Sequence, residues 1–156
     1  QVRAIALNIW ERFNSPESQP HNEPALTVPC RLRQYEVKRL IDQGGMGEVY
    51  EAWHTNLKRH VAIKVIRGVR QDDPAAHDGF LKEMETAGQL EHINLVRAYD
   101  GWEQDGCLFL TQELLDGESL HTLAKRREIN NPEEILSALL GICRALEKLH
   151  SSHVLH

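Results

Sequence analysis

The chain has 156 residues, of which 41% are hydrophobic and 26% are charged, the proportions of an ordinary soluble protein with room for one core. With 23 acidic against 18 basic residues, the formal net charge is −5, so composition gives no reason to expect nucleic acid or an anionic membrane as a partner. No apolar run approaches the ~20 residues of a membrane span, and the three cysteines are too far apart for a disulfide framework or a zinc motif. A cytoplasmic domain, with or without an anchor elsewhere in a longer parent protein, fits this composition.

The first 34 residues are expected to precede the folded part. The chain begins with Gln1 rather than Met, which indicates a fragment or a processed product. Apolar residues at helical spacing predict a short amphipathic helix, at Val2, Ile5, Ile9 and Phe13. Asn14 to Pro29 holds four prolines among polar residues, a composition that predicts a linker. We therefore expect residues 1–34 to be an N-terminal extension and a Pro-rich linker.

Next come two predicted strands joined by glycines. Tyr35 to Ile41 predicts the first strand, and residues 48–53 alternate with the period of two that is typical of a second. Between them stand Gly44, Gly45 and Gly47, which allow a tight turn and a close approach of the backbone to a ligand. A Walker loop would open a helix and carry Gly-Lys-Ser/Thr, and neither feature is present.

A third predicted strand carries a lysine among apolar residues. Along Val61 to Ile66 the period-two rule places Ala62, Lys64 and Ile66 on one face and the remaining residues on the other. A lysine there is costly to bury unless its charge finds a partner, and a phosphate or a carboxylate would serve.

A candidate carboxylate lies on the next predicted element, a helix that follows the polar stretch 68–79. Phe80, Ala87 and Leu90 fall on one stripe of this helix, and Glu83 lies in the same stripe. An inward-facing Glu83 needs a cation, and burying either Glu83 or Lys64 without the other would cost several kcal/mol. The alternative is a Glu83 that is partly exposed on the flank of the helix.

The rest of the chain predicts a hairpin and two helices. Leu95 to Trp102 and Cys107 to Glu113 are expected strands, and the Asp-Gly step between them is a strong hairpin signal. Leu120 to Arg127 predicts a short helix, and Asn131 with the following Pro-Glu-Glu predicts the start of a long apolar one. Three histidines near the end have a regular spacing, but no cysteine or carboxylate pair completes a metal site with them, so we expect none: His150, His153 and His156.

A glycine-rich β-turn followed by Val61-Ala62-Ile63-Lys64 is part of the protein-kinase signature. From Tyr35 to His156 the chain resembles a serine/threonine protein kinase, and Gly-Gly-Met-Gly-Glu-Val-Tyr is most similar to the bacterial, eukaryotic-like branch. The resemblance implies an α+β fold: a kinase small lobe with a five-stranded antiparallel sheet and one helix over 35–115, including the hinge, then the first helices of an α-helical large lobe over 116–156.

The resemblance also implies ATP and Mg²⁺ as cofactors and a Ser/Thr-containing protein as substrate. Lys64 and Glu83 would form the catalytic ion pair that positions the α- and β-phosphates. Around the nucleotide, the family places the glycine turn on the phosphates, apolar residues on the adenine ring, a gatekeeper, the hinge and a residue near the ribose. These implied nucleotide-binding residues are, in that order, Gly44, Gly45, Met46 and Gly47; Ile41, Val49 and Ala62; Gln112; Glu113 and Leu115; and Ser119.

By the same resemblance, His156 is the histidine of the catalytic loop. The catalytic aspartate, the loop asparagine and the Asp-Phe-Gly aspartate that hold magnesium would follow it, so this stretch alone is expected to be inactive and to contain no metal ligand.

Two other classes of function stay open. Asp42 stands where the family has a glycine, and a carboxylate near ATP phosphates favours a pseudokinase or another non-catalytic module that binds nucleotide or a partner. The other class is an unrelated β-rich scaffold, which would make the glycine turn, Lys64 and Glu83 a coincidence.

Overall fold

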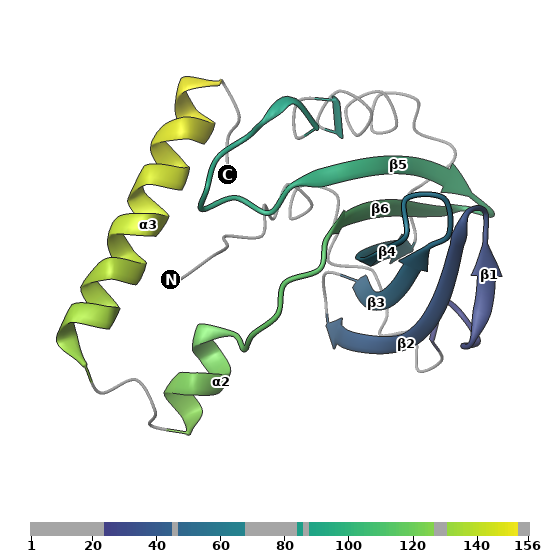
Figure 1. The fold of residues 1–156 in the computed structure, drawn as a ribbon, viewed down its shortest axis with the longest axis horizontal. Helices are drawn as coiled ribbons and strands as arrows, with labels where there is room; N and C mark the ends of the chain where they lie inside the picture. Colours follow the sequence, from purple (N-terminus) through teal and green to yellow (C-terminus); the bar gives the residue numbers. More distant parts are fainter. Residues whose placement is uncertain (1–23, 45–46, 68–83, 86–87, 127–130, 153–156) are drawn as a thin grey trace.

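The computed structural model describes residues 24–44, 47–67, 84–85, 88–126 and 131–152. Figure 1 shows a curved sheet and, beside it, two helices. The elements are β1 (Cys30–Leu32), β2 (Tyr35–Gly44), β3 (Gly47–His54), β4 (Arg59–Arg67), β5 (Ala98–Gln104), β6 (Cys107–Glu113), α2 (Leu120–Lys125) and α3 (Pro132–Ser151). Of the helix expected around Phe80, residues 84–85 and 88–89 are helical, while Glu83 lies outside the described residues.

The sheet has six antiparallel strands in the order β1-β2-β3-β4-β6-β5, which confirms the predicted kinase-like fold with one strand more than expected. The additional strand is β1, which pairs with the start of β2. It lies within residues 1–34, which were expected to be an extension and linker, directly after the proline-containing stretch that ends at Pro29. Apolar residues between those prolines explain the difference, because Ala25, Leu26 and Val28 pack against the core.

The register of β3 against β4 gives the sheet two distinct faces. Glu48 lies opposite Val65 and Tyr50 opposite Ile63, on what we call the core face. Val49 lies opposite Lys64 on the other face, which we call the lysine face. The buried cluster on the core face consists of Leu32, Tyr35, Val37, Tyr50, Ala52, Val61, Ile63, Val65, Trp102 and Phe109. The period-two prediction for β4 is therefore confirmed.

The β5–β6 hairpin forms as the Asp-Gly step predicts. Asp105 and Gly106 separate the two strands and both have positive φ, +52° and +72°. Two successive residues in the left-handed region are the signature of a type I′ turn, whose twist matches that of the flanking strands.

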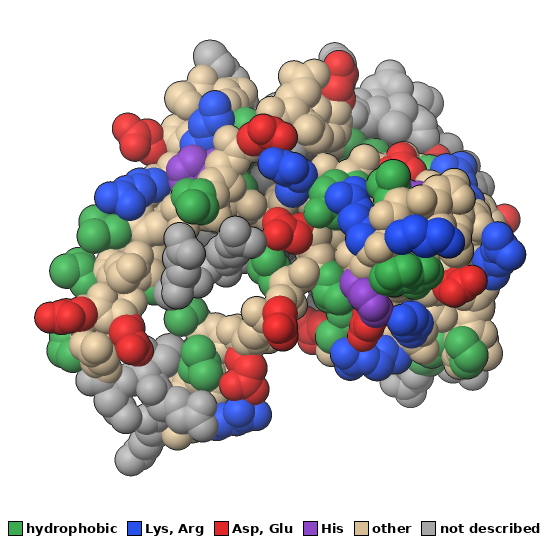
Figure 2. Space-filling model, in the orientation of Figure 1, with side chains coloured by type: hydrophobic (Ala, Val, Ile, Leu, Met, Phe, Trp, Pro, Cys, Tyr) green, Lys and Arg blue, Asp and Glu red, His purple; other side chains and the backbone are tan. Residues whose placement is uncertain are grey.

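Helix α3 begins as predicted, because the Asn131 side chain accepts a hydrogen bond from the Glu133 N–H at 3.0 Å and Pro132 occupies the first turn. It contacts the segment before β5: a Cβ added to Gly141 would lie 3.0 Å from Asn94 Nδ2, and Ala145 and Leu149 pack with Leu90 and Leu95. Figure 2 shows hydrophobic side chains along the outer side of α3. Four large hydrophobic residues of this helix are exposed: Ile135, Leu136, Leu139 and Leu140. Within the described part of the chain, no helix has the length and apolarity needed to cross a bilayer.

The core face predicts a clear contrast between two substitutions. Ile63 is 0% exposed within the cluster, so Ile63→Ala should lower the free energy of unfolding by about 2–5 kcal/mol through lost burial and the cavity left behind. Leu57 lies between β3 and β4 and is 58% exposed, so Leu57→Ala should change the free energy of unfolding by less than about 0.5 kcal/mol. Urea unfolding of both variants measures the difference; equal losses would contradict the assignment of the core.

Candidate functional site

Lys64 occupies the middle of the lysine face. It lies between Val49 on β3 and Leu110 on β6, and it is only 9% exposed. In the neighbouring row Ala62 lies opposite Gln112, so the predicted gatekeeper stands next to the strand that carries the lysine. Because directly opposed residues share a face, β3, β4 and β6 bring Val49, Ala62, Lys64 and Gln112 together on one side of the sheet.

The glycine turn leaves the sheet two residues from Val49. Gly44 and Gly47 pair at the ends of β2 and β3, while Gly45 and Met46 lie outside the described residues. Gly47 has φ +106°, and a Cβ placed on it would lie 2.3 Å from the Val65 carbonyl oxygen. The backbone of β3 thus approaches β4 too closely there for any residue with a side chain. Gly44 has no such neighbour within 4 Å.

The other side of the turn carries the residue that departs from the family pattern. Asp42 pairs with Val49, so it lies in the same cross-strand row as Lys64, with β3 between them. Its Oδ1 accepts a hydrogen bond from the Gln43 N–H at 2.9 Å. The register of β2 shifts between Leu40 and Asp42, and Ile41 at this irregularity is 40% exposed.

The predicted hinge begins where β6 ends. The Glu113 N–H donates a hydrogen bond to the Arg97 carbonyl at 2.9 Å, and residues 114–116 follow outside the ladder of the sheet. Ser119 is the N-cap of α2: its Oγ accepts from the Thr122 N–H at 3.2 Å and lies 2.9 Å from Thr122 Oγ1. This capping role was not foreseen from the sequence.

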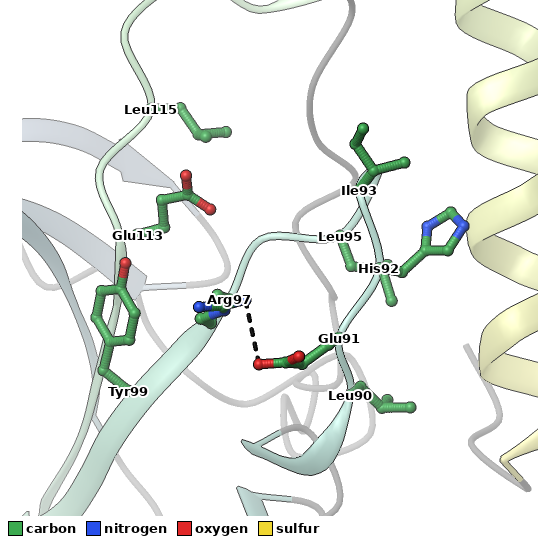
Figure 3. A pocket seen from close by; sticks show the side chains of 9 residues that line it. All are labelled: Leu90, Glu91, His92, Ile93, Leu95, Arg97, Tyr99, Glu113 and Leu115. Carbon is green, nitrogen blue, oxygen red and sulfur yellow. Dashed lines mark ion pairs between the residues drawn. The ribbon is translucent and has the colours of Figure 1, made fainter.

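A cavity of about 440 Å³ adjoins the hinge (Figure 3). It is lined by Leu90, Glu91, His92, Ile93, Leu95, Arg97, Tyr99, Glu113 and Leu115. Arg97 and Glu91 form an ion pair across it at 3.1 Å. Of the predicted site residues that the structure describes, only Glu113 and Leu115 line this cavity; Val49, Ala62 and Lys64 are not among its lining residues.

A second acidic residue on the lysine face is already paired. Glu51 lies opposite Ala62, and its carboxylate binds Arg39 Nη2 at 2.7 Å and lies 3.1 Å from His60 Nδ1. The Arg39 guanidinium offsets part of its negative charge, which reduces the repulsion that Glu51 exerts on an anion on this face.

The sequence analysis missed a buried polar cluster on the core face. Glu48 is 5% exposed; its Oε1 lies 2.8 Å from Arg67 Nη2, and its Oε2 accepts hydrogen bonds from the Tyr50 hydroxyl and, at 2.6 Å, from the Ala25 N–H. Burial, and then the hydrogen bond to Glu48, raises the pKa of Tyr50 to about 12, so its hydroxyl stays protonated and donates. The alternation over residues 48–53 could have predicted this cluster. It places the Glu48 carboxylate on the face opposite to the lysine face, and a buried carboxylate there needs hydrogen-bond or ionic partners.

A family model for the protein kinase domain matches residues 35–156. The chain belongs to the protein kinase family.

Its relatives are bacterial serine/threonine kinases. PknH of Mycobacterium tuberculosis is 35% identical over 122 residues, which cover 78% of this chain and 20% of PknH. PknD of the same organism is 34% identical over 129 residues, covering 83% of this chain and 19% of PknD. The chain thus spans about a fifth of the length of these relatives. Among solved structures, the Mycobacterium tuberculosis PknI kinase domain matches with a TM-score of 0.73 at 28% identity, covering 85% of this chain and 53% of that one.

The glycine turn predicts a contrast between its two ends. Gly47→Ala should lower the free energy of unfolding by about 1–3 kcal/mol, because φ is positive and the new Cβ meets the Val65 carbonyl. Gly44→Ala has open space, so stability should stay the same or rise by up to about 1 kcal/mol. Denaturant unfolding of both variants is the measurement; a Gly47→Ala protein as stable as the parent would contradict the close approach.

Proposed function

We propose that this chain is the ATP-binding part of a serine/threonine protein kinase, which transfers the γ-phosphate of ATP to hydroxyl groups of a protein substrate. The observation that carries the proposal is the position of Lys64: a nearly buried ammonium beside Val49, two residues from the close-packed end of a glycine turn. A cation there can meet the phosphates that the turn would cover. Membership of the kinase family and serine/threonine kinases as relatives support the same activity.

The lysine face also fits the adenine ring. Val49 and Ala62 offer apolar surface on the same side of the sheet as Lys64, and Ile41 keeps 40% of its surface open at the irregularity in β2. Ligand sites of this kind combine apolar walls with a few placed polar groups. Gln112, beside Ala62, would then limit the depth of the pocket.

The hinge supplies the polar groups for the adenine edge. Because the Glu113 N–H is already bonded to Arg97, we assign the donor to the backbone of Leu115, which lies outside the sheet ladder. Ser119 would lie near the ribose while it caps α2. The hinge also divides the proposed lobes, 35–115 and 116–156, since β6 ends at Glu113 and α2 begins at Leu120.

Mg²⁺ would bridge the phosphates and neutralise charge during transfer. In the part of the chain that the structure describes, no three metal-ligating side chains come together, so we assign the ion no ligand there. The role of Glu83 as the partner of Lys64 stays a prediction from the sequence.

A second candidate function is nucleotide or partner binding without phosphoryl transfer. Asp42 favours it, because this carboxylate shares a cross-strand row with Lys64 and would lie close to bound phosphates. At ~6 Å and an effective dielectric constant of ~20, each like-charge pair costs about 2–3 kcal/mol before salt screening.

Replacing the lysine tests the principal proposal. In the full-length protein, Lys64→Met should lower phosphoryl transfer to a protein substrate about a hundredfold or more, because the phosphates lose their positioning charge. Lys38→Met removes an exposed lysine from β2 and should leave transfer unchanged. The measurement is ³²P transfer from ATP. A parent protein that binds ATP without transferring phosphate would support the second candidate, and equal rates for Lys64→Met and the parent would refute the first.

The Asp42 carboxylate should weaken ATP binding. Asp42→Gly should bind ATP about fivefold to tenfold more tightly at moderate salt, since screening reduces the full repulsion. Asp42→Asn separates charge from backbone freedom, because it removes only the charge, and it should recover most of the gain. Titration of ATP into the full-length variants measures the effect; unchanged or weaker binding in both would reject the repulsion.

A further inference from the structure

The residues just before the kinase-family match lie against the sheet instead of leaving it. We call residues 24–29 the strap. Ala25, Leu26 and Val28 pack against the core cluster, and β1 then continues the segment as the edge strand of the sheet. The strap is thus held at both ends by described contacts.

Two backbone groups of the strap bond to side chains of β3. The Ala25 N–H donates to Glu48 Oε2 at 2.6 Å, and the Leu26 N–H donates to the Tyr50 hydroxyl at 3.1 Å. The Tyr50 hydroxyl in turn donates to the same Glu48 oxygen, while Arg67 at the end of β4 binds the other. One buried carboxylate therefore joins the strap, β3 and β4.

Glu48 is a sequence neighbour of Val49, which lies on the lysine face, but its own carboxylate lies on the core face. Glu48 directly follows Gly47, where the turn re-enters the sheet, and directly precedes Val49, which lies opposite Lys64. Successive residues of a strand point to opposite faces. Holding Glu48 on the core face therefore fixes how Val49 and the end of the turn are presented on the lysine face.

We propose that the strap positions the glycine turn: its contacts with Glu48 and Tyr50 hold the start of β3, and releasing them weakens nucleotide binding on the opposite face. Glu48 and Tyr50 are positioning residues here, because neither lies on the lysine face. The inference rests on the proposed function only for its effect on ATP. Its effect on the start of β3 is independent of any ligand.

A hydroxyl deletion offers a matched test in the full-length protein. Tyr50→Phe removes the link between the Leu26 N–H and Glu48 while keeping the ring. Tyr35→Phe is the control: Tyr35 is also fully buried in the core cluster, and its hydroxyl bonds Thr111 Oγ1 at 3.3 Å, a partner on β6 and not on the strap. Both variants should show a similar small fall in melting temperature.

The two variants should differ in two other measurements. With Tyr50→Phe, amide hydrogen exchange at Gly47, Glu48 and Val49 without nucleotide should speed up, and ATP should bind about 3- to 10-fold more weakly, the value of one hydrogen bond. Glu48→Gln should act in the same direction and more strongly, because an amide cannot serve all three donors. Ala25→Pro, which removes the N–H donated to Glu48 and also fixes φ at residue 25, should change exchange and ATP affinity in the same direction as Tyr50→Phe. With Tyr35→Phe both quantities should match the parent.

Each outcome decides the inference. Faster exchange at the start of β3 in Tyr50→Phe and Ala25→Pro, but not in Tyr35→Phe, supports it. Equal changes in amide exchange and ATP affinity in Tyr50→Phe and Tyr35→Phe overturn it. A lower melting temperature of Tyr50→Phe with unchanged exchange also overturns it, and the strap is then a purely stabilising element. If the parent protein binds no ATP, the proposed function fails, and the exchange measurement alone decides the role of the strap.

Discussion

The antiparallel register between β3 and β4 is the constraint on which the other features of this protein depend. It places Val49 opposite Lys64 on one face and Glu48 opposite Val65 on the other. A shift of the β4 register by one residue would exchange its two faces. Lys64 would then point into the core, and the core side chains of β4 would lie on the opposite face. Gly47 helps to fix the register, because only a glycine fits against the Val65 carbonyl. The lysine face and the buried cluster on the core face thus both follow from one strand pairing.

Much of this arrangement could be predicted from the sequence, because it depends on local periodicity. Alternation along residues 61–66 assigned Lys64 to its face, the Asp105-Gly106 step predicted the hairpin, and Asn131-Pro132 predicted the start of α3. Each of these signals lies within a few neighbouring residues. The family resemblance then supplied the antiparallel sheet as a whole, which periodicity alone does not determine.

The features that sequence analysis missed depend on contacts between distant residues. Composition marked the strap as linker, because prolines and polar residues count against a core, yet Ala25 reaches Glu48, 23 positions along the chain. The cavity beside Arg97 likewise brings together residues from Leu90 to Leu115. The exception is the cap formed by Ser119, which is local because its partner Thr122 is three residues away. The pairing of Lys64 with Glu83 stays a prediction, since Glu83 lies outside the described residues.

Strand β1 also bears on where the folding unit begins. The family match starts at Tyr35, whereas β1 covers the outer edge of β2 with residues 30–32. A protein cut at the family boundary would leave the outer backbone N–H and C=O groups of residues 35–37, at the start of β2, open to other chains. Uncovered edges of that kind recruit further strands and promote aggregation. Three residues that precede the family match thus cover the backbone edge at the start of β2.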